Sequence, residues 1–148
     1  MADGYYILMR HGEKYYTMEA VSVVEVVESD HLQKIPGSCE HLEGIMVHRG
    51  ILLPVYVFER GERDSGSKAI LYVIIMYMHE RYIGIMCNEV KMFQVENARF
   101  ISDKNLIKRY NYNDELIELL IDVDNKLYGL IEYNKIDRML DENNIRRN

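Results

Sequence analysis

The segment 33–58 constrains the fold more than any other part of the chain, because it concentrates the residues that restrict backbone geometry. The chain has only 2 prolines and 9 glycines in 148 residues. Both prolines fall in this segment, together with three glycines: Pro36, Gly37, Gly44, Gly50 and Pro54. Pro36 followed by Gly37 predicts a turn. The two β-rich runs that flank residues 47–50 predict a strand, a tight connection and a second strand.

Two residues of this predicted hairpin point to a role at its surface. Arg49 lies beside the tip, where a long side chain projects outward. Pro54 has no backbone N–H, so it belongs on an edge strand or at a bulge. An edge position leaves one side of the strand available for another partner.

The rest of the chain predicts short strands joined by turns every eight to twelve residues or so, a spacing typical of small β-sandwiches and barrels. The predicted strands are residues 5–10, 15–17, 21–27, 44–46, 51–58, 69–78, 82–87, 90–95, 116–123 and 127–131. The polar stretch 97–114 predicts a long loop. Ile136, Met139 and Leu140 have helical spacing, which predicts a short helix near the C-terminal end, over residues 133–143.

The length of the chain favours a single domain over residues 1–148. The Gly- and Ser-containing segment 59–67 is the most loop-like in composition, which predicts a boundary between two halves near 59–68. Half of this chain is marginal as an independent fold. We therefore expect two mainly β halves that share one hydrophobic core.

Charge and hydropathy exclude several functions. A net charge of −6 argues against general nucleic-acid binding, because the phosphate backbone would be repelled. The N-terminal sequence has no basic and apolar pattern typical of an export signal. The longest apolar run, 69–78, is much shorter than the roughly 20 residues that span a bilayer. With only 2 cysteines as well, the chain is expected to be cytoplasmic.

Arg10, His11, Gly12 and Glu13 follow a predicted strand and spell the signature of the histidine phosphatases. In that chemistry a His attacks a phosphoryl group while Arg side chains hold its oxygens. It also needs a helix after the motif and a parallel sheet. The motif is instead followed by a strand-forming sequence, so a hairpin turn is the favoured interpretation and no catalytic residues are assigned.

No cofactor or metal is predicted. Cys39, His41, His48 and Cys87 are metal-binding residue types, but their spacing fits none of the usual zinc patterns. The sequence has no Gly-rich loop for a phosphate group. The 12 tyrosines lie largely on predicted strands, where they are expected to form part of the core.

The segment 33–58 resembles the central segment of the CheW-like domain, the family of chemotaxis coupling proteins. The family pattern is a Pro-containing turn followed by G(V/I)xxxRGxxxPVxDL, and seven residues match it in order and spacing: Pro36, Gly44, Ile45, Arg49, Gly50, Pro54 and Val55. Upstream, residues 23–26 resemble the V-x-E-(I/V) segment. Downstream, 69–78 and 82–93 resemble the second-half hairpin. The resemblance covers residues from about 5 to 140.

The resemblance implies two packed five-stranded SH3-like barrels with a hydrophobic seam between them. It also implies a non-enzymatic adaptor that couples chemoreceptors to a chemotaxis histidine kinase. In such an adaptor the receptor's cytoplasmic hairpin tip docks along a groove, and the kinase's own CheW-like domain docks on the barrel ends. The protein would then be recruited from the cytoplasm to membrane-associated receptor arrays without entering the membrane.

The motif positions give the expected partner-binding residues. Glu25 and Arg49 are expected to approach each other between adjacent strands and to fix the guanidinium at the rim of the receptor groove. The alternative is a plain surface ion pair. Val23, Gly44 and Val47 are expected to form the groove floor, with core packing as the alternative, and Pro54 to shape the edge.

Three positions depart from the family pattern. His48 stands where Asn is common, while Val57 and Asn88 stand where Asp is common. Val57 predicts an altered local ion network. The departures keep open a second interpretation, a CheW-like docking module in a signalling assembly outside chemotaxis.

Overall fold

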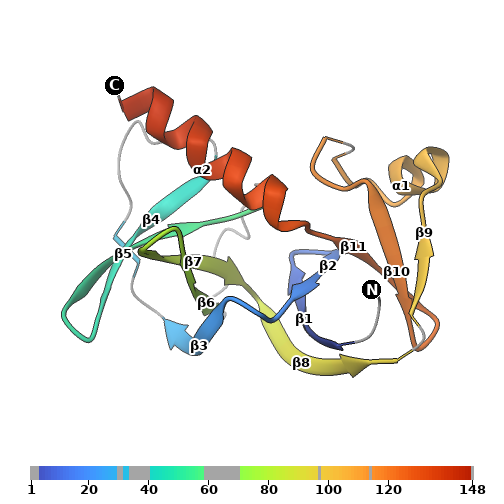
Figure 1. The fold of residues 1–148 in the computed structure, drawn as a ribbon, viewed down its shortest axis with the longest axis horizontal. Coiled ribbons are helices and arrows are strands. Elements are labelled where there is room, and N and C mark those ends of the chain that lie inside the picture. Colours follow the sequence, from blue (N-terminus) through green and yellow to red (C-terminus); the bar gives the residue numbers. More distant parts are fainter. Residues whose placement is uncertain are drawn as a thin grey trace.

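The computed structural model describes residues 4–29, 32–33, 41–58, 71–96, 98–113 and 115–147, which form two β-sheets and two helices (Figure 1). Sheet A has the strand order β8-β1-β2-β11-β10-β9. Its strands are β1 (Gly4–His11), β2 (Lys14–Glu19), β8 (Glu89–Val95), β9 (Arg99–Ile101), β10 (Leu119–Val123) and β11 (Lys126–Leu130). Neighbouring strands are antiparallel except β2 and β11, which are parallel.

Sheet B has the order β3-β6-β7-β5-β4. Its strands are β3 (Val23–Ser29), β4 (Leu42–His48), β5 (Ile51–Tyr56), β6 (Leu71–Met78) and β7 (Arg81–Cys87). The pair β5 and β7 is parallel and the others are antiparallel. The fold is thus mainly β, as the sequence predicts.

Four pairs of consecutive predicted strands form hairpins, namely β1–β2, β4–β5, β6–β7 and β10–β11. Three of them turn through two residues that both have positive φ: Arg49 and Gly50, His79 and Glu80, Asp124 and Asn125. Such tight turns match the right-handed twist of the strands that they join. The turn predicted at Pro36 and Gly37 and the loop predicted at 59–67 lie outside the described residues.

The stretch predicted as a long loop, 97–114, contains two regular elements instead. These are β9, which pairs with β10, and the helix α1 (Lys104–Arg109). Asp103 caps the helix, because its side chain accepts hydrogen bonds from the backbone N–H groups of Asn105 (2.9 Å) and Leu106 (3.3 Å). The predicted helix near the C-terminal end is present and longer than expected, as α2 (Tyr133–Arg147).

Among the described strands, the chain crosses between the sheets at two places, and neither lies near the predicted boundary at 59–68. Strands β5 and β6, which flank that boundary, both belong to sheet B. The crossings are instead at residues 20–22, between β2 and β3, and at Asn88, between β7 and β8. All of sheet B is therefore one continuous segment inserted between strands of sheet A.

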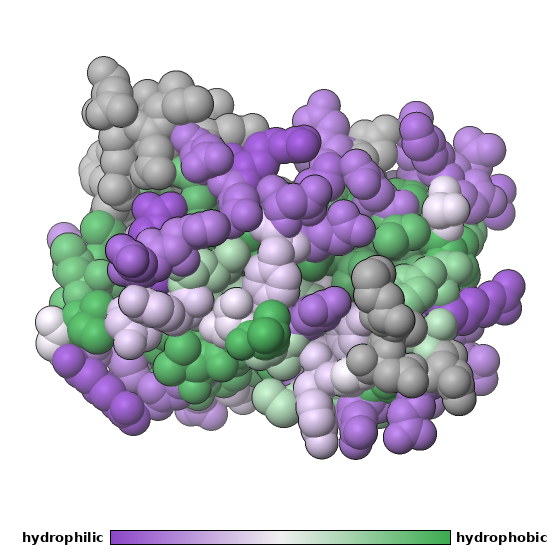
Figure 2. Space-filling view, viewed as in Figure 1, coloured by the Kyte–Doolittle hydropathy of each residue, from purple (hydrophilic) through white to green (hydrophobic). Residues whose placement is uncertain are grey.

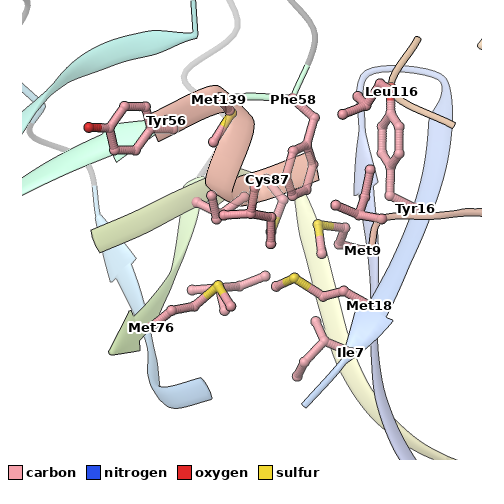
Figure 3. Packing of buried hydrophobic residues seen from close by; sticks show 14 of the residues in the cluster. Ile7, Met9, Tyr16, Met18, Tyr56, Phe58, Met76, Cys87, Leu116 and Met139 are labelled. Carbon is pink, nitrogen blue, oxygen red and sulfur yellow. The ribbon is translucent and has the colours of Figure 1, made fainter. Parts of the chain in front are cut away.

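The largest hydrophobic cluster lies between the two sheets. Met9, Tyr16 and Met18 from sheet A face Met76 and Cys87 from sheet B (Figure 3). Helix α2 crosses from sheet A to sheet B and adds its own apolar side chains, Ile136, Met139 and Leu140, to the same cluster. The two halves thus share one core, as a marginal half-chain requires.

Each sheet also curls around a smaller cluster of its own. In sheet A, Val95 on the edge strand β8 and Phe100 on the opposite edge strand β9 belong to one cluster. In sheet B, Val27 on β3 and Met46 on β4 likewise pack against a common cluster. The strand ladders described nevertheless leave both sheets open, so neither forms a closed barrel, and sheet A has six strands rather than the expected five.

Candidate partner-docking surface

The β4–β5 hairpin presents an apolar outer face. Val47 and Leu52 are directly opposed across the two strands and remain 67% and 66% exposed. Ile45 and Pro54, the next opposed pair on the same face, are half-buried. Hydrophobic side chains gather on the surface over this hairpin, at the left of the view (Figure 2). Exposed apolar surface of this kind is typical of protein-interaction sites.

Glu25 connects β3 to the end of this hairpin through two contacts. Its Oε1 lies 3.1 Å from Nη2 of Arg49, and its Oε2 lies 3.1 Å from Nε2 of His48. The Glu25 and His48 side chains are half-buried, whereas 74% of the Arg49 side chain is exposed. The carboxylate therefore orients a guanidinium whose outer surface is available to a partner.

Glu25 and Arg49 meet, but not between adjacent strands as expected. Strand β3 is one edge of sheet B and β4 is the other. Glu25 is opposite Ile75 of the inner cluster of sheet B, so its side chain lies on the concave face. Curling of the sheet brings the two edges near each other, and the side chains of Glu25, His48 and Arg49 span the opening. We call these three residues the edge cluster.

Backbone hydrogen bonds beside the edge cluster explain why position 44 is a glycine. Gln33 and Ile45 exchange two of them, at 3.0 and 2.9 Å. A Cβ atom at position 44 would lie 2.6 Å from the carbonyl oxygen of Gln33 and 2.8 Å from Cγ of Leu32. Gly44 is buried under this segment. The close approach that it permits is thus made by the chain itself, and Gly44 is not an open groove floor.

Val23 was expected in the floor of the receptor groove. It is instead half-buried against the core between the sheets, as in the core-packing alternative. Its neighbours Val24 and Val26, which sequence reasoning did not select, are 56% and 37% exposed. The register between β3 and β6 shifts between Val23 and Glu25. Burial nevertheless alternates strictly along β3, with Val24, Val26 and Glu28 on the exposed side. Because valines occupy both faces of this strand, apolar character alone could not show which of them are exposed.

Pro54 does not lie on an edge strand, because β5 is placed between β4 and β7. The missing N–H is nevertheless accommodated. Pairing with β7 joins Val55 to Gly84 and Tyr56 to Ile85, and so begins one residue after the proline. The ladder with β4 is also irregular nearby, between Leu42 and Gly44.

The departures from the family pattern have different local consequences. His48 joins the edge cluster. Asn88 accepts a hydrogen bond from the backbone N–H of Gly12 at 2.7 Å, which fixes the β1–β2 turn. Val57 is 1% exposed, and its backbone contacts the backbone and the imidazole of His41 at 2.8 and 3.0 Å. Position 57 is therefore a core position.

The phosphatase-like motif lies on the β1–β2 hairpin. Gly12 is at the turn with φ 62°, and Arg10 donates to the Gly12 carbonyl oxygen (2.6 Å) and pairs with Glu89 (3.2 Å). The sequence after the turn is β2 and not a helix. The motif does follow a strand, but that strand, β1, is antiparallel to both of its neighbours, so the helix and the parallel sheet that the phosphatase chemistry requires are not formed around the motif.

Metal-binding residue types do not gather in the described part of the chain: no three His, Cys, Asp or Glu side chains there lie close enough to share an ion. Of the four residues considered, Cys39 lies outside the described ranges, and Cys87 is buried in the core. Neither described helix has the length and hydropathy needed to cross a bilayer.

The features above define a two-sheet β protein whose distinctive surface is a charged edge cluster beside an apolar hairpin. Residues 5–137 match the family model of the CheW-like domain, and the chain belongs to that family. It is similar in fold to the scaffolding protein TtCheW from Thermoanaerobacter tengcongensis, whose crystal structure superposes with a TM-score of 0.69. The two share 23% sequence identity over 89% of this chain and 90% of that one. No curated protein matches the sequence.

Proposed function

We propose that this protein is a non-enzymatic adaptor that couples the cytoplasmic tips of chemoreceptors to a chemotaxis histidine kinase. Its family membership supports an adaptor role. In this proposal it works in the cytoplasm and is recruited to receptor arrays at the membrane. The receptor tip is a helical hairpin, and it binds by placing apolar side chains in a groove with a few polar contacts to set its register.

The observation that carries the proposal is the edge cluster with its apolar surroundings. Arg49 is exposed but held by Glu25, so little conformational freedom is lost when its guanidinium binds a partner. The exposed Val24 and Val47 lie next to the cluster in sequence and supply apolar contacts. An ordered Arg within apolar surface is typical of the few residues that dominate an interface.

The kinase is proposed to dock through its CheW-like domain at the ends of the curled sheets. The β4–β5 hairpin lies at one of these ends, and its exposed Ile51 and Leu52 supply apolar surface for this contact. Pro54 contributes by shaping the outer face of this hairpin.

Binding of a purified receptor-tip fragment tests the receptor site. We expect Arg49→Ala to weaken binding by about 1–3 kcal/mol, or about 5- to 150-fold in the dissociation constant. The matched control is Arg109→Ala, because Arg109 is an exposed arginine on α1, away from the edge cluster. Circular dichroism should show that both variants remain folded.

Unchanged receptor binding by a folded Arg49→Ala variant would refute the proposed receptor site. The alternative is a docking module in an assembly outside chemotaxis, and the altered edge cluster with His48 in place of Asn favours it. In that case the wild-type protein should fail to bind receptor tips, and purification from the native cell should recover a different signalling partner.

A further inference from the structure

A cavity of about 250 Å³ lies in sheet A, where β11 leads into α2, and the proposed function does not use it. Six apolar or aromatic residues line it: Tyr6, Phe100, Leu119, Leu130, Ile131 and Tyr133. Tyr6, Leu130 and Ile131 are almost completely buried, so the base of the cavity is part of the core. The cavity is smaller than the sites of about 300–1,000 Å³ that hold drug-sized ligands. Its size suits one long side chain.

Tyr133 forms one wall of the cavity, and two hydrogen bonds of its hydroxyl group hold it in place. The hydroxyl donates to the carbonyl oxygen of Glu19 at 2.6 Å and accepts from the backbone N–H of Ser22 at 3.3 Å. These bonds connect the start of α2 to the end of β2 and to the turn that leads into β3. Because the ring is fixed before anything binds, an occupant does not have to order this wall.

Two acidic residues complete the lining, Glu19, which is exposed, and Glu132, which is half-buried. No Lys, Arg or His lines the cavity, and no ion pair joins either carboxylate to a residue in the described ranges. Glu132 directly precedes α2, where the helix dipole also favours a negative charge. Glu19 lies at the end of β2, where no helix dipole favours a negative charge. It is therefore the stronger indication that the cavity binds a cation.

We propose that this cavity binds the side chain of a lysine or arginine that a partner protein presents. The apolar and aromatic walls suit the aliphatic stem, and tyrosine faces attract a cation. The two carboxylates suit the charged end, for which a buried apolar pocket alone would be unfavourable. A neutral apolar anchor would leave the carboxylates without a cation, and an acidic anchor would be repelled. This site does not depend on the edge cluster or on receptor binding.

Capped peptides of the form Ala-Ala-X-Ala-Ala test the proposal by NMR titration of the full chain, with X as Arg, Lys, norleucine or Glu. We expect the Arg and Lys peptides to shift the backbone amides of residues 130–133 and to bind more weakly at high salt. Norleucine has a similar aliphatic stem without the charge. It should bind about tenfold more weakly or not at all, as should Glu.

Three variants and a small-molecule arm make the result decisive. Glu19→Gln and Glu132→Gln should each weaken binding of the Arg peptide several-fold, whereas Glu89→Gln, which changes a glutamate on β8 outside the cavity lining, should not. Equal binding of norleucine, unchanged binding by Glu19→Gln, or shifts that map elsewhere would overturn the proposal. Propylguanidinium that binds much more tightly than the Arg peptide would indicate a site for free organic cations and would overturn the assignment to a partner's side chain. Receptor binding by Arg49→Ala is a separate measurement, so the two proposals can fail independently.

Discussion

Gly44 illustrates how one residue of a recognition motif can act through the fold. A methyl group at this position would meet the backbone oxygen of Gln33 at 2.6 Å, and a backbone oxygen cannot rotate away. We expect Gly44→Ala to lower the free energy of unfolding by about 1–3 kcal/mol, the usual cost of overpacking. Urea denaturation followed by circular dichroism measures this change.

Val47→Ala is the matched control for stability, because Val47 is exposed and its truncation should change stability by less than about 0.5 kcal/mol. The remaining folded Gly44→Ala protein should bind the receptor tip as the wild type does. A fully stable Gly44→Ala variant that has lost receptor binding would instead place Gly44 in direct contact with the partner.

Cys87 should make the protein sensitive to alkali. Burial raises the pKa of its thiol from 9.0 to about 12, and the positive charge of Arg10 offsets only part of this rise. Below the unfolded pKa the thiol is protonated in both states and its contribution to stability is fully present. As the pH rises from about 9 towards 12, the unfolded chain releases this proton while the folded chain retains it, so the free energy of unfolding falls. A single such group contributes at most about 1.4 kcal/mol per pH unit.

Urea midpoints at several pH values above about 8 measure this dependence. Tyr128 and Tyr133 also have raised pKa values because of burial, so the wild-type profile contains their contributions as well. Cys87→Ala removes the thiol alone and should give a shallower decline. Parallel profiles for the two proteins would show that ionisation of Cys87 does not limit stability.

At the scale of elements, the hairpins could be predicted and α1 could not. The hairpins have strong local signals, namely β-branched runs on both sides of short polar turns such as Asp124 and Asn125. Strand β9 has 3 residues and α1 has 6, which is too short for a repeating apolar pattern to stand out. The one available signal was Asp103 before the helix, because Asp is a favoured N-cap residue.

Asp103→Ala tests how much this cap contributes. Two backbone N–H groups of α1 lose their acceptor in the variant, so we expect a loss of about 1 kcal/mol in the free energy of unfolding. Asp103→Asn keeps a side-chain oxygen and should retain most of the stability. If both variants match the wild type in urea denaturation, packing of Ile107 against the core is sufficient to hold α1.

The edge cluster also shows what the sequence of a single strand cannot predict, namely which strands meet in the folded sheet. Motif matching correctly paired Glu25 with Arg49, since it carries information about contacts between distant positions. The sequence of each strand, however, indicates its own buried face and not which edges a curled sheet brings together. The expected adjacency of the two strands was therefore wrong even though the side chains meet, and His48 joined the cluster without having been predicted to do so.

For the whole molecule, the position of the division between the halves was the main failure of the sequence prediction. Composition identified 59–68 as the most loop-like segment, but a long loop can lie within a sheet as well as between two sheets. The actual crossings, at 20–22 and at Asn88, are short and carry no strong loop signal. What the length of the chain did indicate correctly is that the halves share a core.

This shared core predicts that the two sheets unfold together. Met18 from sheet A and Met76 from sheet B are both completely buried in the cluster between the sheets. We expect Met18→Ala and Met76→Ala each to lower the free energy of unfolding by about 2–5 kcal/mol. Each should also speed amide hydrogen exchange in both sheets equally, because neither half has enough core to remain folded alone. Met92→Ala, which truncates a methionine that is 59% exposed on β8, is the control and should leave exchange unchanged. If Met18→Ala speeds exchange in sheet A while sheet B retains its protection, the inserted segment 23–87 is an independent folding unit.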